Sequence, residues 1–212
     1  MSPLITLAQS LGLAYASGIS PYATITLLGL MQRAGWTGPL PGALGALSQT
    51  WVLVIAGALA AIEFVATLVP GVASAWESVH TAIRPPAAAG LAMATAWHAD
   101  PTIIALATIL GGGLAVATHA TKLGLRLAVD TSPEPVTNGV MNVTEWAIVG
   151  SMSYFVWHHP VASLVFALLL LAATIMLLRL AWRWVKRLIG GQPRTPHVVF
   201  VSASAHDVDI GA

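Results

Sequence analysis

The sequence contains no cysteine and very little charge. Without cysteine, disulfides, iron–sulfur clusters and thiolate zinc sites are excluded. Only 8% of the 212 residues are charged, against about 25% in a soluble domain, so the chain cannot cover a water-facing surface. Lys and Arg exceed Asp and Glu by one, nine against eight, which suggests no nucleic-acid partner. The composition argues against a soluble globular domain and predicts an integral membrane protein.

Apolar residues are abundant instead, at 57% of the chain. A membrane-spanning helix needs about 20 consecutive apolar residues. We therefore predict an all-α, polytopic transmembrane helix bundle over 1–189, with a mobile tail over 190–212. Six segments qualify as spanning helices, at about residues 4–30, 51–69, 81–97, 101–129, 140–157 and 161–188.

Two local patterns interrupt this bundle. Pro21 lacks a backbone donor and lies inside the first apolar run, so we expect that helix to be interrupted over 17–21. Residues 72–84 place Val72, Trp76 and Val79 opposite Glu77 at helical spacing. This amphipathic pattern predicts a helix that lies in the membrane interface or re-enters the membrane.

Orientation follows from basic residues beside the spanning helices. Six crossings with a cytoplasmic C-terminus put both termini of this multi-pass protein on the cytoplasmic side of the cell (inner) membrane. Arg84, Lys122 and Arg126 then also fall on the cytoplasmic side, and only Arg33 falls outside. The residues that crowd the end of the last segment are Arg179, Arg183, Lys186, Arg187 and Arg194.

Six helices divide into three and three, which predicts an inverted repeat. Residues 7–16 match residues 106–115 at a constant offset. Pro21 and the glycines at 111–113 are the two places where the backbone could break at depth and line a site. Small residues that merely allow close helix packing are the alternative.

Ionisable side chains are the informative residues, because each costs about 2.5–3.5 kcal/mol at bilayer depth unless it is paired or hydrated. His119, Lys122 and Arg126 share one helix face. We predict a polar network that joins them to acids on other helices. Candidate ligand-binding residues are Ser17, Ser20, Tyr22, Glu63, Thr118, His119, Lys122, Glu134, Asn138 and Glu145. Candidate gate residues are Glu77, His80, Arg84 and Arg126.

Simpler explanations exist for several of these residues. Glu63 could be protonated or hydrogen-bonded by a neighbouring hydroxyl, and Arg126 could extend to the cytoplasmic boundary. Glu77 and His80 have the Glu-x-x-His spacing of di-iron bundles, but those bundles need two copies and the chain has one. We therefore expect no metal site and no cofactor.

Several polar motifs resemble a bacterial integral-membrane family catalogued as domain of unknown function 4126. The resemblance covers about residues 5–160, and it carries no activity over to this chain. It implies that these motifs, rather than the apolar residues between them, are the features to test. They lie at residues 17–22, 63–65, 69–72, 76–87, 118–122 and 132–138.

Three functions compete at this stage. The first is a transporter of a small solute or a lipid headgroup, in which Glu63 couples protons or binds a cation while His119 and Lys122 contact an anionic group. The second is a non-catalytic scaffold or accessory subunit, and the third is a membrane enzyme that modifies lipid. The expected partners are membrane lipid and an unidentified small solute or ion. A homo-oligomer or a membrane partner stays open.

Overall fold

The computed structural model describes residues 2–130 and 135–190, and within these ranges every regular element is helical. The predicted tail beyond Gly190 and the candidate residue Glu134 lie outside the described residues. The elements are α1 (Pro3–Ile19), α2 (Pro21–Arg33), the short 3-10 helix η1 (Gly42–Ser48), α3 (Thr50–Ala66), α4 (Val72–His80), α5 (Arg84–Thr95), α6 (Pro101–Asp130), α7 (Pro135–His158) and α8 (Pro160–Gly190).

Helix α1 is the centre of the bundle and packs against α5, α6, α7 and α8. Small residues make its close crossing with α6 feasible. A Cβ atom on Gly18 would lie 3.0 Å from the Cα atom of Ala115, and one on Gly111 would lie 3.2 Å from the Cβ atom of Ala14. Helix α6 continues through 111–113 without a break. Of the two alternatives for these glycines, the structure therefore fits close helix packing at Gly111 rather than a backbone break.

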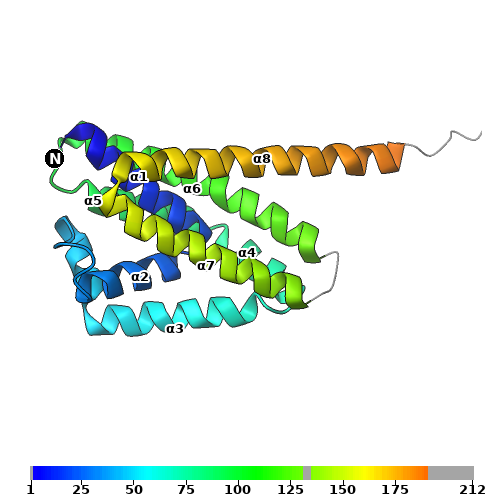
Figure 1. Ribbon diagram of the computed structural model, residues 1–212, viewed down its shortest axis with the longest axis horizontal. Helices are drawn as coiled ribbons and strands as arrows, with labels where there is room; N and C mark the ends of the chain where they lie inside the picture. Colours follow the sequence, from blue (N-terminus) through cyan, green and yellow to red (C-terminus); the bar gives the residue numbers. More distant parts are fainter. Residues whose placement is uncertain (1, 131–134, 191–212) are drawn as a thin grey trace, which may run out of the picture.

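The chain reverses direction at Ser20. This residue ends α1 by donating its N–H to the carbonyl of Ala16 (3.0 Å), and its hydroxyl caps α2 by accepting from the N–H of Ala23 (3.1 Å). Pro21 cannot continue the hydrogen-bond ladder of α1. Figure 1 shows α2 folding back from the end of α1, so the two form a hairpin with Ser20 at its tip. The single predicted helix over 4–30 is therefore two antiparallel helices.

This hairpin changes the topology. Figure 1 shows the N-terminus and the end of α8 at opposite ends of the long axis, whereas six crossings predict both termini on one side. The repeat also disagrees with the geometry. Helix α1 runs in the same direction as α6, because Ala14 meets Gly111 and Gly18 meets Ala115. An inverted repeat requires these two matched helices to run in opposite directions.

Membrane-spanning capacity differs among the helices. Within the described ranges, α6 alone is long and apolar enough by itself to cross a membrane, over Pro101–Val129. A second span is counted if η1 and α3, which meet at a bend of 76°, act together. Helix α5 has 12 residues and extends about 18 Å, which is short of a hydrocarbon core about 30 Å thick.

Burial is inverted relative to a soluble protein. The apolar side chains of Val72 and Val79 on α4 are 46% and 65% exposed, while Glu77 is fully buried. The amphipathic pattern over 72–84 thus reflects a helix whose polar face points inward. Arg84, Lys122 and Arg126 are also buried, so they are not exposed loop charges of the kind that the orientation rule counts.

Candidate functional site

A buried network of charged side chains lies where the hairpin tip meets α3, α4, α5, α6 and α7. It contains three carboxylates and three cations, and each helix contributes residues from the part that faces this point. Glu63 comes from α3, Glu77 from α4, Arg84 from the first turn of α5, Lys122 and Arg126 from α6, and Glu145 from α7.

Arg84 joins two of the carboxylates. Its guanidinium donates through both Nη atoms to the carboxylate of Glu77, and Nη2 lies 2.5 Å from Oε1 of Glu63. The hydroxyl of Ser20 donates to the other oxygen of Glu63. The side chain of Arg84 is completely buried. A planar guanidinium suits this position because it presents several donors in a fixed geometry.

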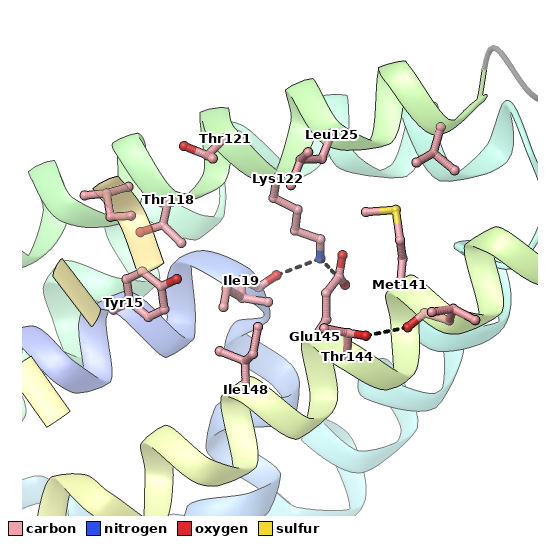
Figure 2. A pocket seen from close by; sticks show the side chains of 13 residues that line it. Tyr15, Ile19, Thr118, Thr121, Lys122, Leu125, Met141, Thr144, Glu145 and Ile148 are labelled. Carbon is pink, nitrogen blue, oxygen red and sulfur yellow. Dashed lines mark hydrogen bonds and ion pairs between the residues drawn. The ribbon is translucent and has the colours of Figure 1, made fainter. Parts of the chain in front are cut away.

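Lys122 links the network to the hairpin. Its Nζ atom donates to the carbonyl of Ile19 (2.8 Å) and pairs with Glu77 (2.9 Å) and Glu145 (3.0 Å). In a continuous helix the Ile19 carbonyl would accept from the N–H of Ala23. That N–H bonds the Ser20 hydroxyl instead, so the break in the backbone leaves this carbonyl for Lys122. Figure 2 shows Lys122 reaching from α6 toward Ile19 and Glu145.

Arg126 closes the network on α7. Its Nη2 atom lies 3.0 Å from Glu145 and also bonds the side-chain oxygen of Asn142, while Nη1 donates to the carbonyl of Thr67 (3.1 Å). The Nη1 atom of Arg126 also lies 3.5 Å from the side-chain oxygen of Asn138. Asn142 and Thr67 were not among the predicted residues. Asn138, Asn142 and Glu145 recur at i, i+4 and i+7 and therefore share one helix face. The same spacing argument that grouped His119, Lys122 and Arg126 on α6 would have found Asn142.

Two histidines border the network. The Nδ1 atom of His119 lies 2.9 Å from Arg84, and its Nε2 atom lies 2.9 Å from the hydroxyl of Thr81. Because guanidinium has no acceptor, Nδ1 of His119 must accept, which assigns the neutral tautomer with the proton on Nε2. His80 contacts the hydroxyl of Tyr22 (3.1 Å) and stacks on the ring of Trp76.

The network is electrically neutral, because three carboxylates face three cations and His119 is neutral. Removing each ion from water costs several kcal/mol, which only close pairing offsets. The Glu77 carboxylate is fully buried on α4 and pairs with both Lys122 and Arg84. Among the described residues, no group of three or more His, Asp or Glu side chains is arranged to hold a metal ion.

A cavity of about 370 Å³ adjoins the network between α6 and α7, beside the last part of α1, which contributes Tyr15 and Ile19 to its lining. Its walls are mostly apolar, and Lys122 and Glu145 are its charged lining residues (Figure 2). The Glu145 side chain is 16% exposed, whereas the other network side chains are at most 6% exposed. Glu145 is therefore the charged group that a molecule in this cavity meets first.

Most of the predicted residues come together here. Thr118 lines the cavity, and the hydroxyl of Ser17 is buried without a hydrogen-bond partner among the described residues. The candidate ligand-binding residues and the candidate gate residues do not form separate groups, because Arg84 of the gate group pairs with Glu63 of the binding group as well as with Glu77. The predicted residues placed in the network or in direct contact with it are Ser20, Glu63, His119, Lys122, Asn138, Glu145, Glu77, Arg84 and Arg126, with Tyr22 and His80 paired beside it.

Comparison with known proteins identifies a family but no activity. The model of the family described as Domain of unknown function (DUF4126) matches residues 7–180. No curated protein and no solved structure matches the chain. The match covers most of the sequence, which confirms the resemblance of the polar motifs: the chain belongs to this family.

Proposed function

We propose that this member of the family is a multi-pass membrane protein. The apolar exterior supports this, because charges are buried while large hydrophobic side chains face outward on several helices. Val54 on α3, Ile109 on α6, Val143 on α7 and Leu169 on α8 are each between 62% and 71% exposed. Water would disfavour such a surface over so many helices, and a bilayer would accept it.

The topology we propose has five crossings in place of the predicted six. They are α3, the pair α4 and α5, α6, α7 and α8, while the hairpin of α1 and α2 enters the membrane and returns. The C-terminal part of α8 carries Arg179, Arg183 and Lys186, so that end is assigned to the cytoplasm. The N-terminus then lies on the opposite side.

We further propose that the protein binds or translocates a small solute or a lipid headgroup at the buried network. The observation that carries this is the cavity, which reaches a charged network inside an apolar-surfaced bundle. Ionisable groups at this depth are commonly functional. Glu145, as the most exposed acid of the network, takes the ligand-contacting role that the sequence suggested for Glu63.

A flux measurement tests this proposal. Proteoliposomes are assayed for uptake or exchange of ions, phosphates, amino acids and lipids, with Glu145→Gln as the test variant. Asp100→Asn is the matched control, because it also removes one carboxylate while retaining the helix cap, in which Asp100 accepts from the N–H of Thr102 (2.8 Å). We expect one solute class to move with wild type and Asp100→Asn but not with Glu145→Gln. Absence of flux and of binding for every class would contradict the proposal.

A scaffold or accessory subunit is the second candidate. It is favoured by the neutrality of the network, because a self-paired cluster can hold helices together without any ligand. Purification with one stoichiometric membrane partner, together with no cavity-dependent binding, would support this candidate over the first.

A further inference from the structure

We propose that the cavity between α6 and α7 binds the headgroup of a phospholipid that carries a primary ammonium, with the ammonium on Glu145. This inference rests on the proposed function and names its ligand class. It follows from three features of the cavity: which hydrogen-bonding groups it offers, what net charge it tolerates, and where its opening leads.

The cavity offers hydrogen-bond acceptors. Each Glu145 oxygen accepts from one cation, Lys122 or Arg126, and a carboxylate oxygen has a second lone pair available. The threonine hydroxyls that line the cavity already donate to carbonyls of their own helices, those of Thr118 and Thr144 at 2.9 and 2.8 Å, so their remaining lone pairs can only accept. Tyr15 also lines the cavity, and its phenol can donate to the phosphate of a headgroup. A ligand with several N–H donors therefore matches this lining.

The network does not offer a free cation to an anionic ligand. Lys122 has three N–H donors, and these are directed at Ile19, Glu77 and Glu145. An anion would have to displace one of these partners. The network is also neutral, so a ligand with net charge would leave an uncompensated charge at low dielectric. A zwitterionic headgroup brings an ammonium to Glu145 without changing the total charge.

The opening of the cavity faces the apolar exterior. Val140 lines the cavity and is 62% exposed, and Val136, one turn before it on α7, is 74% exposed. A ligand therefore enters from the bilayer rather than from water. A volume of about 370 Å³ is at the small end for ligand sites, roughly 300–1,000 Å³. It suits a headgroup whose acyl chains remain outside against α6 and α7.

Lipid competition on the purified full chain tests this inference. The protein is delipidated in detergent, and bound lipid is counted by native mass spectrometry with phosphatidylethanolamine, phosphatidylcholine or phosphatidylglycerol of identical chains. Phosphatidylcholine is the sharpest comparison, because three methyl groups replace the N–H donors. We expect phosphatidylethanolamine to bind at least about tenfold more tightly, the worth of one charge-assisted hydrogen bond. Free phosphoethanolamine, which shares the headgroup but lacks chains, should not compete.

Four variants test whether the lipid preference depends on the residues of this cavity. Glu145→Gln should abolish the preference for phosphatidylethanolamine, and Asp100→Asn should retain it. Because Glu145→Gln removes a partner of two buried cations, Thr144→Val provides a milder test that should weaken the preference without unfolding. Leu125→Trp, which fills the cavity, should remove the bound lipid altogether.

The outcomes separate this inference from the proposed function. Equal binding of the two zwitterionic lipids, stronger binding of phosphatidylglycerol, or tight binding of free phosphoethanolamine would each overturn the ligand assignment. The proposed function would survive these results if Leu125→Trp still abolished ligand binding or flux. If Leu125→Trp changed neither, the cavity would not be a binding site and both proposals would fail.

Discussion

Arg84→Gln should be among the most destabilising single substitutions in this protein. The guanidinium is fully buried and pairs with both Glu63 and Glu77. Without it, Glu77 keeps Lys122 at 2.9 Å, whereas the nearest remaining cation to Glu63 is Lys122 at 3.7 Å. Glu63 is then a buried, undercompensated carboxylate. Breaking a buried ion pair in this way costs about 3–5 kcal/mol.

The measurement is unfolding of the full chain in mixed micelles titrated with dodecyl sulfate, followed by far-ultraviolet circular dichroism. Arg179→Gln is the control, because it removes the same charge from an exposed position on α8 and should change the free energy of unfolding by less than about 0.5 kcal/mol. The double variant Glu63→Gln with Arg84→Gln should recover part of the loss, since it removes the stranded carboxylate. A cost below about 1 kcal/mol for Arg84→Gln, or purely additive effects in the double variant, would refute the reasoning.

Three further substitutions probe the packing and the hairpin. Gly111→Ala should lower the free energy of unfolding by about 1–3 kcal/mol, because the new methyl group would lie 2.7 Å from the Cβ atom of Ala92. The control Gly113→Ala should be neutral or slightly stabilising, because its methyl group meets nothing within 4 Å. Equal effects of the two variants in the same titration would contradict the close packing of α5 on α6. Ser20→Ala should cost about 1–2 kcal/mol by removing the cap of α2, and Ser20→Thr should restore part of it; no loss would mean that the cap is dispensable. Asn142→Leu should lower the free energy of unfolding by about 1–3 kcal/mol, because the side-chain oxygen of Asn142 accepts from Arg126 and its amide nitrogen donates to the carbonyl of Phe64 (2.8 Å). Wild-type stability of this variant would argue against the contacts between Arg126 and α7.

The sequence allowed the composition of the network to be predicted better than its arrangement. A charge in an apolar segment is a local signal, so Glu63, Lys122 and Glu145 could be found one residue at a time. Asn142 escaped because a neutral amide costs less in an apolar segment and stands out less. The grouping of Glu77 and Arg84 with Glu63 could not be predicted, because it depends on how α4 and α5 pack on α6.

The same limit explains why the direction of α2 was not predicted. Ser20 and Pro21 signalled a break, but a break alone leaves the direction of the next helix open. Tertiary contacts decide that direction: Arg33, at the end of α2, donates to the hydroxyl of Thr50 (2.6 Å), and Ser20, before its start, donates to Glu63. Helix α2 is thereby held antiparallel to α3. Counting apolar segments treated 4–30 as one crossing, and in the topology we propose this single difference changes an even number of crossings to an odd one.

The break at Ser20 also accounts for the position of the site. Because α1 ends there, the space between α6 and α7 beyond Ile19 contains no further turn of α1. The same break leaves a backbone carbonyl for Lys122 and directs a hydroxyl at Glu63. A continuous helix would occupy the space, satisfy the carbonyl internally and move the hydroxyl away. One interruption of the backbone therefore provides the contacts of Lys122 and Glu63 with the hairpin and leaves room for the cavity beside Glu145.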